Sequence, residues 1–278
     1  MYELGLLIKV KNSHSIVDML EKVVSFGFKT CHFSTYVPDE IYTDEHARLI
    51  KNFCDEHGIR ISMFWAGWPG DHKWDFVHGP NTVGLVPAEY REERVRYIKM
   101  GSDFAKKLGV DCIASHAGYI PENLSDPLYK EFLESIKEIA SHCKSNGQWF
   151  CFETGQETPI TLLRTITDSG ADNLGVNLDP ANLVMYGKGN AVDSLKVFGR
   201  YVKGVHIKDG LYPNNGYELG AEVAIGEGDV QMPAFLQALK NAGYTGPLTV
   251  EIELDRRLEE MSLEEAVTQA KSFLNKYI

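Results

Sequence analysis

The chain repeats one pattern eight times: a short apolar segment is followed by an amphipathic segment of helical period. The apolar segments are rich in Val, Ile, Phe and Cys and have the length of buried strands. They cover residues 4–9, 29–35, 59–65, 110–116, 149–153, 174–179, 202–208 and 248–252. The amphipathic segments cover residues 15–27, 39–58, 88–108, 126–146, 160–169, 190–200, 231–242 and 262–277. This strict alternation predicts a parallel sheet with right-handed crossovers.

Eight strand–helix pairs favour closure of the sheet into a barrel, with an open doubly wound sheet as the alternative. The 278 residues are enough for one (β/α)8 barrel, which typically takes about 250, and no linker-like or low-complexity segment interrupts them. No GxGxxG or GxxxxGKS/T motif follows the first apolar segment, which removes the main signatures of open-sheet nucleotide binders. We therefore predict an α/β protein with a single TIM-barrel domain over residues 1–278.

Composition restricts the partners of this chain. Its formal net charge of −11 disfavours nucleic acid and anionic membrane surfaces, both of which need a basic face. No uncharged apolar run reaches about 18 residues, so we expect no membrane span. The five cysteines form no CxxC pair, which is typical of buried thiols in a reducing compartment, and we expect a cytoplasmic protein. Assembly into a homo-oligomer stays open.

Ionisable side chains end the last four apolar segments, and they all fall on the same face. Side chains alternate faces along a strand, and the opposite face of each of these segments is apolar and must meet the outer helices. The mixed face therefore points into the barrel, and its ends converge at the C-terminal mouth, where barrel active sites lie. The side chains in question are Glu153, Asp179, His206 and Glu251.

This group favours a site for one divalent metal ion. Three carboxylates so close together cannot all stay ionised without a compensating cation. The alternative is a set of rim salt bridges with Lys188 or Lys208. All four residues stand at corresponding strand ends, however, and this shared position favours the metal ion. Three oxygens and one imidazole suit Mn²⁺, our first expectation, and also Mg²⁺ or Co²⁺, with Zn²⁺ as a further alternative.

Five motifs surround these strand ends: FETG (152–155), NLDPANL (177–183), VHIKDG (205–210), IGEGDV (225–230) and GYTGPLTVEIE (243–253). Together they resemble motifs of the xylose-isomerase-like sugar isomerase/epimerase superfamily. That superfamily includes D-tagatose and D-psicose 3-epimerases, inosose dehydratase, hydroxypyruvate isomerase and, more remotely, the endonuclease IV enzymes. The resemblance covers most of the chain and implies a TIM barrel that acts on a small carbohydrate.

The resemblance also implies roles for individual residues. Glu153, Asp179, His206 and Glu251 would bind the metal ion, and Glu153 and Glu251 would act as acid and base from opposite faces of the substrate. The ion lowers the pKa of the C–H bond beside a carbonyl and stabilises the enediolate, so that one glutamate removes the proton and the other returns it.

Two departures from the family pattern fall where substrate contact is expected. Asn182 stands where the epimerases carry a histidine, and HIKD, with Lys208 and Asp209, stands where they commonly place an arginine. The metal ligands are unaffected, but a strict ketose 3-epimerase is less favoured.

Further side chains are candidates for contact with the substrate. His116 ends the fourth apolar segment, although a hydrogen-bonded core histidine is the alternative. Lys208 points into the mouth and would hold a hydroxyl or carboxylate, unless it pairs with Asp209 or Glu157. Glu157 follows the fifth apolar segment and would reach a sugar hydroxyl, unless it is solvent-exposed. Trp68 belongs to an aromatic loop at residues 65–87, which predicts either a lid over the substrate or a dimer contact.

Two more glutamates near the mouth are given lesser roles. Glu253 shares a face with Glu251 and competes for the ligand role, but the motif match favours Glu251. Glu227 lies between glycines and is expected to have a structural role in a tight turn.

The sequence therefore predicts a metal-dependent isomerase or epimerase of a small sugar or hydroxy-ketone. A dehydratase or lyase of the same superfamily is the first alternative, because the enediolate can expel a β-hydroxyl instead of being reprotonated. An endonuclease-IV-like phosphodiesterase is less favoured, since it needs more histidines at strand ends and a basic face. A non-catalytic binding module is disfavoured by the complete ligand set.

Overall fold

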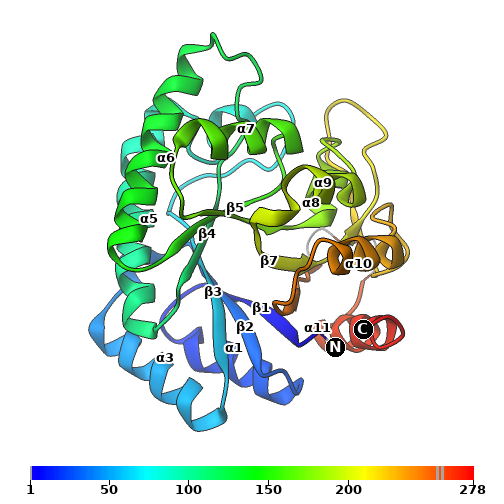
Figure 1. The fold of residues 1–278 in the computed structure, drawn as a ribbon. Helices are drawn as coiled ribbons and strands as arrows, with labels where there is room; N and C mark the ends of the chain where they lie inside the picture. The colour runs from blue at the N-terminus through cyan, green and yellow to red at the C-terminus, as the bar shows by residue number, and fades with distance from the viewer. Residues whose placement is uncertain (1, 255–256, 258–259) are drawn as a thin grey trace.

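The structure is a computed structural model that describes residues 2–254, 257 and 260–278. Eight parallel strands form a closed barrel in the order β1-β10-β7-β6-β5-β4-β3-β2, with helices around it (Figure 1). The predicted (β/α)8 barrel is confirmed, and the open sheet is not found. The strands are β1 (Leu4–Val10), β2 (Thr30–Thr35), β3 (Arg60–Ala66), β4 (Cys112–His116), β5 (Trp149–Glu153), β6 (Leu174–Leu178), β7 (Val202–Ile207) and β10 (Leu248–Val250).

The outer helices bury their apolar faces against the outside of this barrel. Phe33, Phe64 and Phe150 point outward from their strands and join the helices in one core. The helices are α1 (Ser15–Ser25), α3 (Asp44–His57), α5 (Ala88–Leu108), α6 (Pro127–Ser145), α7 (Pro159–Ser169), α9 (Ala191–Phe198), α10 (Met232–Asn241) and α11 (Leu263–Leu274). None of the described helices is long and apolar enough to cross a lipid bilayer.

The helix predicted over residues 39–58 is wrong as a single element. The chain forms α2 (Pro38–Ile41) and then α3, because Thr43 is extended and its side chain accepts a hydrogen bond from the His46 amide as the N-cap of α3. Several short elements were not predicted: α4 (Gly79–Thr82), α8 (Pro180–Met185), the 3₁₀ helix η1 (Gly199–Tyr201), β8 (Asp209–Gly210) and β9 (Glu222–Val223).

A small apolar cluster fills the barrel interior below the mouth. It contains Met63, Trp65, Cys112, Ala114 and Cys151. Cys151 lies two residues before Glu153 on the same face of β5, so this cluster forms the floor beneath the ionisable strand ends.

Candidate metal centre

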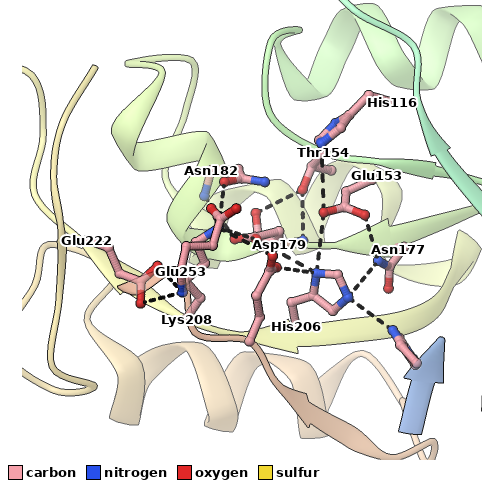
Figure 2. Close-up of polar contacts among 12 residues, drawn as sticks. His116, Glu153, Thr154, Asn177, Asp179, Asn182, His206, Lys208, Glu222 and Glu253 are labelled. Atoms are coloured by element: carbon pink, nitrogen blue, oxygen red, sulfur yellow. Dashed lines mark hydrogen bonds and ion pairs between the residues drawn. The ribbon is translucent and has the colours of Figure 1, made fainter. Parts of the chain in front are cut away.

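The four predicted ligands meet at the carboxyl ends of the barrel strands. Glu153 ends β5, Asp179 and Glu251 directly follow β6 and β10, and His206 lies in β7. Figure 2 shows Glu153, Asp179 and His206 facing one another. Their exposed fractions, and that of Glu251, range from 0% to 5%. These are therefore buried groups and not salt bridges at an exposed rim.

The separations of the ligand atoms fit a single ion. One atom from each of the four side chains lies within 4.8 Å of the others. His206 Nδ1 is 2.9 Å from Glu251 Oε2, 3.4 Å from Glu153 Oε1 and 3.8 Å from Asp179 Oδ2. Ligand atoms about 2.1 Å from an octahedral ion are about 3.0 Å apart when adjacent and about 4.2 Å apart when opposite.

Three of these atoms also have the hydrogen-bonding state expected of metal ligands. His206 Nδ1, Asp179 Oδ2 and Glu251 Oε2 are buried, and although they lie close to one another, none has a partner in hydrogen-bond geometry among the residues that the structure describes. Buried polar atoms in this state are rare in proteins, and a bound cation is one physical reason for them. The residues present therefore fit a divalent ion.

Asp179 uses its two oxygens for different tasks. Oδ1 caps α8 by accepting a hydrogen bond of 2.9 Å from the Asn182 amide, and Pro180 occupies the first helical position. The Thr154 hydroxyl bonds both the amide and the carbonyl of Asp179, which ties the end of β6 to that of β5. The helix cap thus turns Oδ2 toward His206.

His206 is oriented by His32. Burial, and then the neighbouring His206, hold the pKa of His32 well below its usual range, so His32 is neutral. Its Nδ1 lies 3.0 Å from His206 Nε2, and this contact turns Nδ1 of His206 toward the carboxylates. Gly204 makes room for the neighbouring Asn177, because a Cβ there would lie 2.5 Å from Asn177 Oδ1.

Glu153 is likewise held through one oxygen. Its Oε2 accepts hydrogen bonds from the indole of Trp65 and, at 3.3 Å, from the amide of Asn177. The other oxygen, Oε1, faces His206 and lies 3.9 Å from His116 Nε2. Each carboxylate ligand thus has one oxygen directed to the common space.

The charges at this site are strongly coupled. Burial raises the pKa of Glu251, but Lys208, His206 and Lys9 outweigh it and hold that pKa well below the usual range. Burial raises the pKa of Asp179 above its ordinary value. Burial lowers the pKa of His206, but Glu153 and Glu251 outweigh this and raise it well above the ordinary value. The site thus has the field of an excess of negative charge, which a divalent cation neutralises.

Lys208 lies beside the ligands and is only 1% exposed. Its Nζ is 2.6 Å from Glu253 Oε2, 3.6 Å from Asp179 Oδ2 and 3.7 Å from Glu251 Oε1. The alternative that Lys208 pairs with Asp209 or Glu157 is wrong, because its side chain points from the end of β7 toward Glu253, which follows β10. Glu253 also binds Lys9 at 2.6 Å, so it belongs to this ion-pair network.

The two departures from the family pattern contact each other. Lys208 Nζ donates to Asn182 Oδ1 at 3.3 Å (Figure 2). Both side chains line the same cavity above the ligands. The two residues that depart from the family pattern therefore lie side by side on the cavity wall, although they are far apart in the sequence.

A cavity of about 400 Å³ opens above the four ligand atoms. This volume lies within the roughly 300–1,000 Å³ range of small-molecule pockets. Its wall is partly aromatic and includes residues of the loop after β3, so part of the aromatic loop faces the mouth. The lining residues with aromatic rings are Tyr36, Trp65, Trp68, His72, Trp74, His116, Tyr186 and His206.

Asp209 braces one side of the mouth. Its carboxylate accepts hydrogen bonds from the amides of Gly210, Gly226 and Val230. Gly226 has φ +96° and a Cβ there would lie 2.2 Å from a ring carbon of Phe273. The GEG turn is therefore structural, as predicted, and Glu227 itself is exposed.

A family model described as a xylose isomerase-like TIM barrel matches residues 20–277. The chain belongs to this family. The xylose isomerase domain protein of Planctomyces limnophilus has a crystal structure that matches with a TM-score of 0.86 and 35% identity, over 99% of this chain and 98% of that one.

Other proteins to which the chain is similar are more distant. An uncharacterized protein of Methanocaldococcus jannaschii is 28% identical over 190 residues, 63% of each chain, so this chain spans less than two thirds of that relative. Inosose dehydratase of Lacticaseibacillus casei is 20% identical over 75% of this chain and 74% of its own. The structure of an L-ribulose 3-epimerase has 17% identity and a TM-score of 0.75 over 99% and 94% of the chains, which shows a shared fold.

Most of the predicted substrate-facing residues of this xylose isomerase-like barrel line the cavity. Trp68, His116, Asn182 and Lys208 do so, whereas Glu157 is not among the lining residues. Glu157 is only 2% exposed, so the expectation of a solvated loop acid is wrong. The loop between β5 and α7 lies against α8, since a Cβ at Gly155 would be 3.5 Å from the Asn182 Cβ.

Sequence reasoning missed several residues that contact the candidate metal ligands or line the cavity. His32 and Asn177 hold the ligands, and Lys9, Tyr36 and Gln156 line the cavity. A signal existed for Asn177, which shares a face with Asp179 in the sixth strand. Lys9 and His32 lie on β1 and β2, and these strands come close to β10 only because the barrel closes.

Proposed function

We propose that this protein is a divalent-metal-dependent isomerase or epimerase of a small sugar or hydroxy-ketone. The observation that carries the proposal is the convergence of Glu153 and Glu251, from strands separated by β6 and β7, on one space below a cavity. Two carboxylates that approach from different sides suit removal of a proton on one face and its return on another.

The reaction uses these two side chains as a pair. When bound, a divalent ion supplies Lewis-acid polarisation of a substrate carbonyl and its neighbouring hydroxyl. One glutamate takes the proton from the carbon beside the carbonyl, and the electron pair of that C–H bond forms the enediolate. The other glutamate returns a proton to the same carbon in an epimerase or to the neighbouring carbon in an isomerase. No redox partner is needed, because substrate and product are isomers.

The chemistry of the cavity supports an uncharged, hydroxyl-bearing substrate. Its lining contains Lys9 and Lys208. The Nζ atom of each lies 2.6 Å from an oxygen of the Glu253 carboxylate. Neither cation is therefore available to clamp a phosphate at the mouth. The aromatic wall suits the C–H faces of a sugar. His116, Asn182, Lys208 and Trp68 are the proposed substrate contacts.

We propose Mn²⁺ as the resident ion, with Mg²⁺, Co²⁺ and Zn²⁺ as alternatives. Three carboxylate oxygens and one imidazole are a hard, mixed ligand set. Glu157 stays a predicted substrate contact that would require the Thr154–Thr158 loop to shift.

A dehydratase is the second candidate, and Lys208 is the observation that favours it. Burial lowers the pKa of Lys208, but the carboxylates around it raise it well above its ordinary value, so this buried side chain carries a proton at the cavity wall. A protonated ammonium there would stabilise the charge that develops on a departing β-hydroxyl, and the glutamate that removed the C–H proton would supply it to the leaving water. A relative that is an inosose dehydratase agrees with this chemistry.

Deuterium exchange tests the proposal directly. Protein loaded with Mn²⁺ is incubated in D₂O with free ketoses, inososes and 3-keto sugars, and NMR follows deuterium at carbons beside the carbonyl. We expect exchange in the wild type that is lost on removal of the metal and in Glu251→Gln. Glu56→Gln changes an exposed glutamate of α3 and is the matched control, which should exchange like the wild type.

The labelled carbon separates the candidates. Label on the carbon whose configuration changes indicates an epimerase, label on the former carbonyl carbon indicates an isomerase, and loss of water indicates a dehydratase. Stoichiometric metal binding without exchange in any substrate would contradict the proposed proton transfer.

A further inference from the structure

Gln156 presents an unusual amide to the cavity. It lies in the loop between β5 and α7, is 1% exposed and lines the cavity. Neither its Oε1 nor its Nε2 has a hydrogen-bond partner among the residues that the structure describes. A buried amide that makes no hydrogen bonds within its protein is costly to keep and is therefore uncommon.

Gln148 shows how the same chain treats another buried glutamine. Its Oε1 accepts a hydrogen bond of 2.5 Å from the Ser102 hydroxyl. Its Nε2 donates to the carbonyls of Ser102 at 3.1 Å and Val110 at 2.8 Å. The amide of Gln148 is thus saturated by the fold, whereas the amide of Gln156 is not. The difference indicates that Gln156 serves a ligand.

Two further polar groups on the cavity wall share this property. The indole nitrogen of Trp68, a residue 1% exposed, and Nδ1 of His116, a residue 6% exposed, have no hydrogen-bond partner within the described chain. Trp68 follows β3, His116 ends β4 and Gln156 follows β5, so they occupy three successive positions around the barrel. The metal ligands occupy the next positions, from β5 to β10.

We infer that Gln156, with Trp68 Nε1 and His116 Nδ1, forms a subsite for hydroxyl groups on the substrate carbons beyond the reacting pair. This inference rests on the proposed function and specifies its substrate class. An indole N–H only donates, whereas the glutamine amide both donates and accepts, as a hydroxyl does. The subsite therefore selects a polyhydroxylated ketone with an extended hydroxyl-bearing chain or ring. A three-carbon hydroxy-ketone bound at the metal ligands would not reach it.

Gln156→Met tests the subsite because methionine keeps a similar shape without hydrogen bonds. The probes are D-fructose, which carries hydroxyls beyond the reacting carbons, and dihydroxyacetone, which does not. In the D₂O exchange assay we expect the ratio of kcat/KM for D-fructose to that for dihydroxyacetone to fall about tenfold or more. A ratio equal to that of the wild type overturns the subsite.

Thermal unfolding supplies a readout that does not require turnover. Without sugar, Gln156→Met should keep or raise the Tm, since it removes no internal hydrogen bond, whereas Gln148→Met should lower it by about 4 °C or more. With about 100 mM D-fructose and Mn²⁺, the wild type should gain more Tm than Gln156→Met. A lower Tm of Gln156→Met without sugar, or an equal response of the two proteins, including no response, overturns the inference.

The two assays separate the failures. Absence of exchange with every ketose, together with a fructose-dependent Tm gain that Gln156→Met reduces, rejects the proposed reaction and supports the subsite. If both proteins catalyse deuterium exchange with the same preference for D-fructose over dihydroxyacetone, and D-fructose raises their Tm equally, the proposed reaction is supported and the subsite is rejected.

Discussion

The carboxyl group of Glu157 makes the stability of this protein depend on pH in a calculable way. The side chain is 2% exposed, and neither oxygen has a hydrogen-bond partner among the described residues. Burial raises its pKa from 4.5 to about 8, although nearby backbone amides and the charge of Lys188 lower it in part. The folded protein therefore holds this proton over a pH range in which the unfolded chain has lost it.

The sign and size of the effect follow from that difference. Below pH 4.5 the carboxyl is protonated in both states, and its neutral form is compatible with burial. As the pH rises toward about 8, only the unfolded chain releases the proton, so the free energy of unfolding falls. At ~1.4 kcal/mol per pH unit, the full loss is roughly 5 kcal/mol, reached near pH 8 and constant above it.

Glu157→Gln removes this dependence, because the amide stays neutral at every pH. The free energy of unfolding of the variant minus that of the wild type should increase by several kcal/mol between pH 5 and pH 8. Urea denaturation at both pH values measures it, and other titrating groups cancel between the two proteins. Glu56→Gln, which changes an exposed side chain, should give the same difference at both pH values. A difference for Glu157→Gln that does not change with pH would refute the burial argument.

Three further substitutions test the metal centre and its support. Asp179→Asn should keep the cap of α8, since asparagine caps as well as aspartate, yet weaken Mn²⁺ binding about tenfold or more by calorimetry; unchanged affinity would argue against Asp179 as a ligand. Gly204→Ala should lower the free energy of unfolding by about 1–3 kcal/mol in urea, because the new Cβ would lie 2.5 Å from an amide oxygen. Gly216→Ala, with no atom near its Cβ, is the control, and equal stability of the two variants would contradict this. Lys208→Met leaves buried carboxylates without their ammonium and should lower the free energy of unfolding of the metal-free protein by about 3–5 kcal/mol in urea. A variant as stable as the wild type would show that the ion pairs of Lys208 contribute little to stability.

Local sequence could predict the barrel and the grouping of its candidate metal ligands for one shared reason. Strand and helix periods are properties of short segments, and parallel strands all end at the same edge of the sheet. A residue at a strand end therefore has a fixed height and face, and the strand pattern alone is enough to group Glu153, Asp179, His206 and Glu251. The same logic failed where a local cap overrides a period, as Thr43 does between α2 and α3.

Patterns within short segments were enough to predict a barrel, the group of four ionisable strand ends and the aromatic character of the loop after the third strand. The pairing of Lys208 with Glu253, the contact of His32 with His206 and the place of Gln156 on the cavity wall required the three-dimensional arrangement. Those contacts join residues from distant segments, and their distances depend on strand register, barrel closure and the path of each loop. Burial of Glu157 likewise depends on the path of the loop between β5 and α7, which no period or motif in that loop encodes.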